Sequence, residues 1–369
     1  MLAGPTLFQV DRGRGECYNG ALLPMRPLSA LIVAMLLIGA LGVAGLPVRS
    51  AAGAPDTTSP AWVWPLPPEK PRIQHQLTFI TPQDLGAKRG FFSRLWDFIV
   101  GEDTVDRIQS PHGVVADSEG AVYVADWGVG LIHYFHFGKK KYDSFAKTKI
   151  GPLVSPIGLA LDDDGLLYVT DSVKRRVFVF SGTKNKRVIG DDSLVRPTGI
   201  AINRKAKLLY VVDTGGHRVD VFDLEGKRLF SFGSNGTEDG EFNYPTHLAL
   251  DRAGDVYVMD SLNFRVQIFD RNGKYLSQFG GNGTSIRDFM KPKGIAVDSE
   301  GHIWVSDSLR NTVQVFDRSG RLLLIFGRLG IEPGQFDIPA GICMDDKDRL
   351  FVADSYNYRV QVFQYLRSD

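Results

Sequence analysis

Three histidines are the residues of this sequence best suited to metal or acid–base chemistry. His112 and His247 follow prolines that open two similar segments, and His217 lies in a loop between two apolar runs. Neutral imidazoles that converge on one point can hold Zn²⁺ and leave a fourth position open for catalysis. His247 stands one residue further from its proline than His112 does, and such a shift turns a strand side chain to the other face. We therefore predict that the three histidines do not form a metal site.

Six aspartates that end strand-like runs are a second set of candidates for chemistry. They are Asp126, Asp171, Asp213, Asp260, Asp307 and Asp354. In four cases an arginine follows five residues later, at Arg176, Arg218, Arg265 and Arg359. A carboxylate that recurs in every segment serves what every segment needs. We predict that these aspartates bind turn amides and pair with the arginines, and we assign none of them a catalytic role.

The elements that must position these residues form six repeats of roughly 40–48 residues, the length of one propeller blade. The repeats begin at Pro111, Pro156, Pro197, Pro245, Pro292 and Pro339. Each contains runs of four to six β-branched or aromatic residues bounded by Gly, Asp or Pro, which predicts strands rather than helices. Four antiparallel strands per repeat predict an all-β fold, a six-bladed β-propeller.

The repeated pattern resembles a known family. P-x-G-[IV]-A-[VL]-D, then [VI]-[YW]-V-x-D-[ST] and R-V-x-[VI]-F, resembles the NHL repeat over residues 111–363. The resemblance implies a six-bladed propeller. Members of this class range from scaffolds and RNA binders to lyases, so the resemblance implies little about function.

Two enzyme families of similar fold provide a comparison for the candidate residues. Peptidyl-hydroxyglycine lyases place zinc-binding histidines directly after the blade-opening proline in three blades, and only His112 matches that position here. Calcium-dependent lactonases gather Glu, Asn and Asp at the channel mouth, where the corresponding positions of this chain hold no carboxylate. We expect no cofactor, and Zn²⁺ or Ca²⁺ would be the ion of an enzymatic alternative.

Segments outside the repeats predict how the ring closes and where the protein acts. Residues 73–80 have a strand pattern and are expected to supply the outer strand of the last blade. Residues 82–100 predict a short amphipathic helix, and residues 55–72 a Pro-rich linker. Residues 1–54, with an uncharged apolar run over 28–46, predict a signal peptide or a transmembrane anchor. We expect a bacterial protein, exported or membrane-anchored, with its propeller on the extracytoplasmic, periplasmic side.

Charge and cysteine content narrow the classes of partner. The 43 Lys and Arg residues nearly balance the 42 Asp and Glu residues, so net charge indicates no polyanionic partner. Residues 139–207 are locally basic, but export makes a nucleic acid an unexpected partner. Cys17 and Cys343 are the two cysteines of the chain, too few for a disulfide framework.

The face of a propeller that holds the loops before each first strand also holds the loops joining second and third strands. On that face we expect His112, Trp127, Thr198, His217, Thr246, His247, Lys293, Arg310 and Tyr356. Polar groups that converge within an apolar rim are typical of a binding site. The favoured hypothesis is a non-catalytic module that binds an envelope protein or a glycan there. The alternative is a metal-dependent lyase or a lactonase-type hydrolase at the same face.

Overall fold

The computed structural model of the chain describes residues 62–86 and 107–367. The expected signal or anchor over residues 1–54, including the apolar run 28–46, lies outside the described residues. In the part that is described, no helix is both long and apolar enough to cross a membrane.

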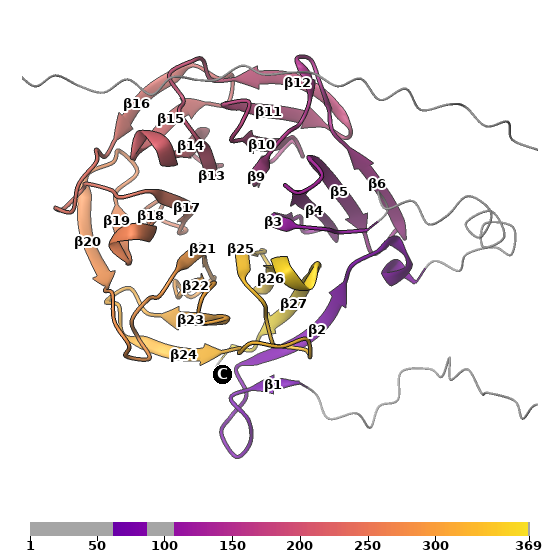
Figure 1. Ribbon diagram of the computed structural model, residues 1–369, viewed down its shortest axis with the longest axis vertical. Helices are drawn as coiled ribbons and strands as arrows, with labels where there is room; N and C mark the ends of the chain where they lie inside the picture. Colours follow the sequence, from indigo (N-terminus) through magenta and orange to yellow (C-terminus); the bar gives the residue numbers. More distant parts are fainter. Residues whose placement is uncertain (1–61, 87–106, 368–369) are drawn as a thin grey trace, which may run out of the picture. The chain divides into compact units, whose positions relative to one another are not determined.

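Six antiparallel sheets surround a common axis and form the blades of a propeller (Figure 1). Blades 1 and 2 consist of β3 (Pro111–Ala116), β4 (Ala121–Asp126), β5 (Leu131–His136) and β6 (Lys141–Phe145), and of β9 (Pro156–Leu161), β10 (Leu167–Asp171), β11 (Arg176–Ser181) and β12 (Lys184–Ile189). Blades 3 and 4 consist of β13 (Pro197–Asn203), β14 (Leu208–Asp213), β15 (Arg218–Asp223) and β16 (Arg228–Phe232), and of β17 (Pro245–Leu250), β18 (Val256–Asp260), β19 (Arg265–Phe269) and β20 (Tyr275–Gly280). Each first strand begins at the proline that opens its repeat.

The last two blades complete the ring. Blade 5 consists of β21 (Pro292–Val297), β22 (Ile303–Asp307), β23 (Thr312–Phe316) and β24 (Leu322–Phe326), and blade 6 of β25 (Pro339–Met344), β26 (Arg349–Asp354), β27 (Arg359–Tyr365) and β2 (Ile73–Phe79). A short hairpin of β7 (Lys147–Thr148) and β8 (Gly151–Pro152) lies between blades 1 and 2 in the sequence. The fold is therefore an all-β, six-bladed propeller.

An N-terminal strand closes the propeller. β2 pairs antiparallel with β27, and Ile73 lies opposite Tyr365, so the segment expected over residues 73–80 is the outer strand of blade 6. Ser355 Oγ also donates to the carbonyl of Pro111 at 2.6 Å, across 244 positions of sequence. Residues from both ends of the repeat array thus hold the ring shut.

Part of the expected linker is structured instead. β1 (Val63–Trp64) pairs with β2 and makes blade 6 a five-stranded sheet. The Trp64 ring lies 5.5 Å from the ring of Phe326 and 5.8 Å from that of Phe363. Composition alone predicts an unpacked Pro-rich segment, but burial of a large aromatic side chain stabilises this short strand.

The segment expected to form a helix over residues 82–100 begins differently from that expectation. It opens with η1 (Pro82–Leu85), a single 3-10 turn, and Gly86 follows it in the left-handed conformation with φ 68°. The Asp84 carboxylate accepts the Thr81 backbone N–H at 2.9 Å, which caps the turn. Residues 87–100 lie outside the described residues.

The hydrophobic core lies between the blades. Six clusters of buried side chains fill the six interfaces between neighbouring blades. One cluster, for example, joins Trp304 of blade 5 to Leu350 of blade 6. Each blade buries both of its faces, which explains why strands such as β10 are buried along their whole length.

Candidate functional site

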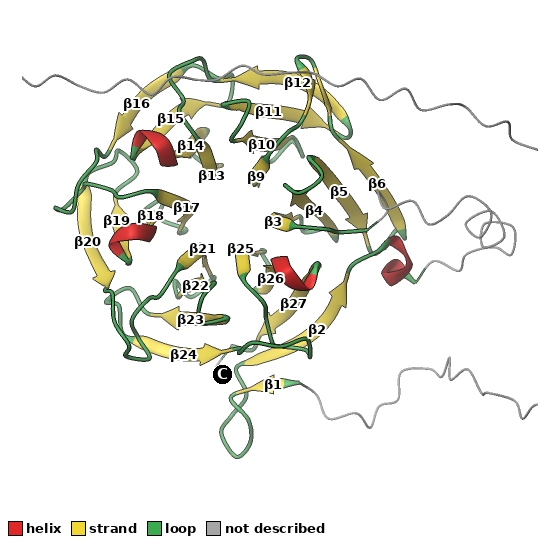
Figure 2. Cartoon of the chain, in the orientation of Figure 1, coloured by secondary structure: helices red, strands yellow, loops and turns green. Residues whose placement is uncertain are grey.

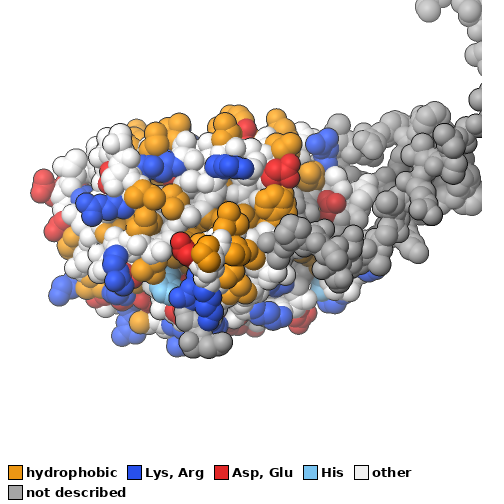
Figure 3. Space-filling model, turned by 90° about the horizontal axis from the view of Figure 1, so that it is seen from below, with side chains coloured by type: hydrophobic (Ala, Val, Ile, Leu, Met, Phe, Trp, Pro, Cys, Tyr) orange, Lys and Arg blue, Asp and Glu red, His pale blue; other side chains and the backbone are white. Residues whose placement is uncertain are grey.

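The two faces of the propeller expose different kinds of side chain. We call the face with the loops before each first strand and the loops joining second and third strands the top face, and the opposite one the bottom face. Of twenty exposed large hydrophobic residues in the described residues, fifteen lie in top-face loops. They are Trp127, Val129, Ile150, Val154, Val173, Val195, Tyr244, Leu262, Ile286, Met290, Leu309, Leu329, Ile331, Tyr356 and Tyr358. In a side view of the disc, hydrophobic side chains lie along the upper edge and mainly charged ones along the lower edge (Figure 3).

The bottom face has a charged rim around a funnel. A cavity of about 880 Å³ is lined by first-strand residues such as Ala249 and Cys343 and by the turns that follow those strands. Burial raises the pKa of the Cys343 thiol to about 11, so the thiol is neutral. The turn aspartates are engaged by the backbone: Asp251 Oδ1 accepts the N–H groups of residues 253, 254 and 255 at 2.9 Å. In the bottom-face turns, aspartate carboxylates are therefore already hydrogen-bonded to backbone N–H groups.

Two histidines meet at the axis. His112 of blade 1 and His247 of blade 4 stack with ring centroids 5.4 Å apart and an interplanar angle of 11°. Blades 1 and 4 are three steps apart in a ring of six, and β3 and β17 lie on opposite sides of the centre (Figure 1). Side chains from opposite blades can touch only at the axis, so this pair spans the channel at its top end.

The prediction that His247 turns away from His112 is wrong, and the reason is a β-bulge. The register of β17 with β18 shifts between Pro245 and Leu248, and that of β3 with β4 shifts between Pro111 and Gly113. A bulge inserts an unpaired residue and re-aims the side chains beside it, so strict alternation does not hold at the start of these strands.

Close approach of neighbouring first strands explains where the His247 side chain goes. Five blades have glycine at this position, and an added Cβ would overlap the next blade's backbone; on Gly294 it would lie 2.6 Å from the Ala340 carbonyl oxygen. In blade 4 a histidine occupies this position, against the backbone of blade 5. Its ring therefore extends to the axis, which is the space left to it.

Positive groups surround the histidine pair. Burial lowers the pKa of His247 from 6.5 to about 4, and the charge of Lys293 adds to this effect. The pKa of His112 is lowered well below its usual value. Burial is the largest cause, and His247, Lys293 and Arg196 lower the pKa further. The pKa of Lys293 is lowered by burial and then by Lys291. Both imidazoles are therefore neutral at pH 7, beside cations.

The ring nitrogens of the pair lack partners. His112 Nδ1 and both nitrogens of His247 are buried without a hydrogen-bond partner among the described residues. The nearby Lys293 backbone raises the pKa of His247 and so offsets part of the decrease caused by burial. Neither ring nitrogen of His247 nevertheless makes a hydrogen bond with a described residue. An unsatisfied buried polar group costs roughly 1–3 kcal/mol. This arrangement is therefore held at a cost in stability.

Several other expected binding residues have structural contacts. Thr198 Oγ1 bonds with Thr214 Oγ1 at 2.6 Å and donates to the Thr246 carbonyl at 2.8 Å. Thr246 Oγ1 in turn donates to the Lys293 carbonyl at 3.0 Å. These hydroxyls link blade 3 to blade 4 and blade 4 to blade 5, so their hydrogen bonds are made within the ring.

The remaining expected residues lie in the top-face loops that join second and third strands. His217 has a left-handed backbone after the 3-10 helix η3 (Thr214–Gly216), and its ring packs 4.6 Å from that of Tyr244. Arg310 donates from Nη2 to the Ser285 carbonyl at 2.6 Å. Trp127 and Tyr356 are exposed on the top face. The helices η4 (Ser261–Asn263) and η5 (Ser355–Asn357) occupy the same loop of other blades as η3, spaced around the ring (Figure 2).

The histidines do not converge as a triad. His217 Nδ1 lies 3.2 Å from the Phe242 carbonyl, in contact with the loop that leads into blade 4. Among the residues that the structure describes, no three His, Cys, Asp or Glu side chains are grouped so as to hold a metal ion. The chemistry available at the top face is thus that of neutral imidazoles beside ammonium and guanidinium groups.

The six repeated aspartates hold the loops that lead into the first strands. All six are fully buried. Asp354, for example, accepts the Asp337 N–H and the Arg359 Nε–H, both at 2.7 Å. Asp213, Asp260 and Asp354 pair with Arg218, Arg265 and Arg359, respectively.

One of the four expected ion pairs between a repeated aspartate and an arginine does not form, and in one blade a histidine takes the place of the arginine. Arg176 donates to Asp192 Oδ1 at 2.8 Å and has no contact with Asp171 among the described ion pairs. In blade 1, where no arginine is present, His133 Nε2 lies 3.1 Å from Asp126 Oδ2. The loop before blade 3 bends close to the Arg176 guanidinium and provides nearer acceptors, the carbonyl of Asp191 included.

Comparison with known proteins agrees with this geometry. The NHL repeat family matches residues 153–180, 242–269, 289–316 and 336–363, which lie in blades 2, 4, 5 and 6. This chain carries NHL repeats. It is 31% identical over 85 residues to protein brain tumor of Drosophila melanogaster and 31% identical over 178 residues to human NHL repeat-containing protein 3. These matches cover 23% and 41% of this chain, but only 8% and 48% of the relatives' own lengths.

A solved structure shares the fold of this NHL propeller. It is a catalytically inactive virginiamycin B lyase from Staphylococcus aureus with quinupristin, with a TM-score of 0.54 and 14% sequence identity. The match covers 70% of this chain and 96% of the lyase. At this level of identity the likeness concerns the fold alone.

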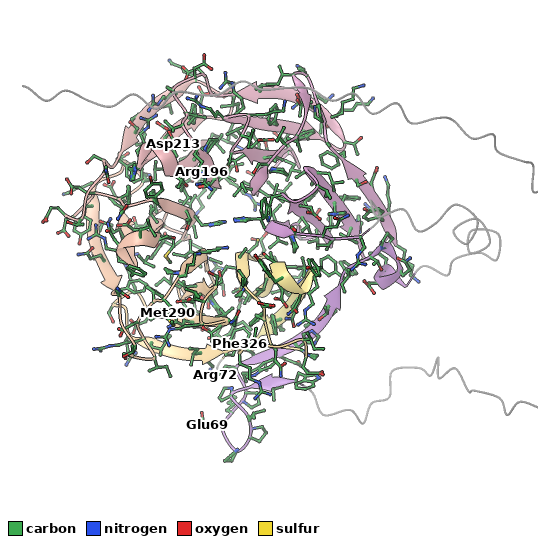
Figure 4. All side chains as sticks on the ribbon, viewed as in Figure 1. Glu69, Arg72, Arg196, Asp213, Met290 and Phe326 are labelled. Atoms are coloured by element: carbon green, nitrogen blue, oxygen red, sulfur yellow. The ribbon has the colours of Figure 1, made fainter. Side chains whose placement is uncertain are left out.

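One residue at the mouth of the NHL propeller was missed by reasoning from sequence. Arg196 lies on the inner side of blade 3 (Figure 4), where its charge reaches His112. Arg196 immediately precedes the opening proline Pro197. Lys291 occupies the same position in blade 5, immediately before Pro292. Attention to residues on both sides of each opening proline would have identified Arg196.

Proposed function

We propose that this chain is a non-catalytic interaction module that acts outside the cytoplasm and binds a partner protein through its top face. The observation that carries the proposal is the concentration of fifteen exposed large hydrophobic residues in the loops of one face. Exposed apolar side chains concentrated on one face of a soluble protein point to an interaction site there. Most of the fifteen side chains are aliphatic, and such side chains gain most from burial against other apolar groups, which favours a protein over a glycan.

The N-terminal segment supports the proposed location. An uncharged run of 19 residues, 28–46, follows Arg26 and precedes a tail of small residues, which favours export with cleavage or retention as a membrane anchor. An envelope protein is then the expected partner. Protease added to intact cells would degrade the propeller if it lies outside the cytoplasmic membrane, once any outer membrane is made permeable, and would leave it intact if it lies inside.

Photo-crosslinking tests whether the partner binds to the top face. A crosslinking amino acid at Leu309, which is 58% exposed on the top face, should capture a defined partner in cells, whereas one at Arg252 in a bottom-face turn should not. The captured protein is then purified and its affinity for the propeller is measured. Equal capture from both faces would contradict the proposal.

A matched pair of variants completes the test. Ile331 is 73% exposed on the top face, and Leu323 is 42% exposed on the outer strand of blade 5. Burial of one such side chain is worth about 1.5–3 kcal/mol, so Ile331→Asp should weaken binding by at least about tenfold. Leu323→Asp should leave the affinity unchanged. Equal affinity of both variants and the parent protein would mean that binding uses another surface.

A further inference from the structure

The mouth of the channel at the centre of the top face has an unusual set of unpartnered groups. Within the described residues, the ammonium of Lys293 and the guanidinium of Arg196 have no hydrogen bond or ion pair. His112 Nε2 has no hydrogen bond either and, unlike Nδ1, is not buried. The stacked ring of His247 lies against His112 and fixes its orientation. One imidazole nitrogen without a partner thus lies within the electrostatic reach of two cations that have no partner among the described residues.

The charge around this point favours an anion. The charged groups that act on His112, His247 and Lys293 are all positive: Lys293, Arg196 and Lys291. Among the groups of the described residues, no carboxylate acts on any of the three. Such a cluster of like charge is unfavourable on its own and becomes favourable when a negative group enters it.

The geometry of the pair disfavours a metal ion. The lone pairs of an imidazole lie in the plane of its ring, and rings stacked with an interplanar angle of 11° direct them side by side rather than toward one point. A cation at the mouth would also be repelled by Lys293 and Arg196. A carboxylate, by contrast, accepts one N–H from a neutral imidazole and the charge-assisted bonds of an ammonium and a guanidinium.

We propose that the channel mouth binds a carboxylate of the partner protein, with His112 Nε2–H and Lys293 as donors, Arg196 at the edge and His247 as the positioning residue. This inference rests on the proposed function, because the apolar rim would hold the side chains next to that carboxylate. The carboxylate comes from the C-terminus of the partner or from an acidic side chain of the partner.

Titration with acetate tests the site without any partner. Acetate is added to protein with isotope-labelled histidine, and the side-chain NMR signals of His112 and His247 are followed. A saturable change at His112, with its pKa raised by about one unit when acetate is bound, is the expected result. Acetamide is the neutral probe of equal size and should cause no saturable change. No response to acetate, or an equal response to acetamide, would overturn the proposal.

Two lysines provide a matched pair. Lys293→Ala should weaken acetate binding by about tenfold, since it removes one charge-assisted hydrogen bond. Lys291→Ala removes the same charge two residues away on an exposed side chain and should change the affinity less than about twofold. Equal effects of the two changes would mean that acetate responds to net charge and not to a built site. Retained partner binding with no acetate response would refute this inference and leave the proposed function standing.

Peptides distinguish the source of the carboxylate. One probe is an apolar tetrapeptide with a free C-terminal carboxylate, and the other is its amidated counterpart with one internal Asp. Tighter binding of the first assigns the site to a chain terminus, and tighter binding of the second assigns it to an acidic side chain. If neither binds more tightly than acetate, the assignment of the carboxylate to a protein partner is wrong.

Discussion

Acid should destabilise this propeller through its buried histidine pair, and His247→Gln should remove much of that effect. The pKa of His247 is lowered from 6.5 to about 4, chiefly by burial. The folded state therefore holds fewer protons than the unfolded state between those two values. The stabilisation is fully present above about pH 6.5 and is lost as the pH falls toward about 4.

The magnitude follows from the shift. A difference of about 2.5 pKa units corresponds to about 3 kcal/mol when the loss is complete, and to about 2 kcal/mol at pH ~5. The free energy of unfolding is measured with urea at about pH 7 and about pH 5, in a cationic buffer free of carboxylates. Between these values the parent protein should lose about 2 kcal/mol more than the His247→Gln variant.

A second histidine provides a control of opposite sign. The pKa of His302 is raised by its hydrogen bond with Asp298, at 2.9 Å between Nδ1 and Oδ2. The stabilisation from His302 is present below pH ~6.5 and is lost as the pH rises through the raised pKa, so His302→Gln should be more destabilising at pH ~5 than at pH ~7. If the free energy of unfolding of the parent protein and of His247→Gln changed with pH in the same way, the His247 imidazole would not be sequestered from water, which would refute the reasoning.

Three further changes probe the fold, each with the free energy of unfolding in urea as the measurement. Trp64→Ala should cost about 2–4 kcal/mol, since it removes the aromatic contacts of β1, whereas Trp62→Ala, at a side chain 48% exposed, should cost less than about 0.5. Equal losses would mean that β1 does not stabilise the ring. Asp354→Ala should cost about 3 kcal/mol because it leaves a buried guanidinium and a loop amide without their carboxylate; a loss under about 1 would contradict the structural role. Gly294→Ala should cost about 1–3 kcal/mol through overlap with the next blade, whereas Gly281→Ala, with open space around it, should be nearly neutral.

The sequence by itself determined the propeller. Six repeats, each opening with Pro-x-Gly or Pro-Thr-His and containing short β-branched runs, admit one architecture, because a four-stranded blade buries its faces only against its neighbours. The role of the buried aspartates also followed from repetition, and all six are fully buried. The strand over 73–79 could be placed because repeat six lacks an outer strand and the ring must close.

The tertiary structure alone decided which side chains meet. His112 and His247 are 135 positions apart, and local alternation predicts that they diverge; a β-bulge at each strand start, together with the position of blades 1 and 4 across the ring, brings them into contact. Thr198 and Thr246 have the pattern of binding residues, but the approach of neighbouring blades engages their hydroxyls. Local sequence specifies a strand and its faces. Contacts across the axis depend on the curvature of the whole ring, which no single repeat contains.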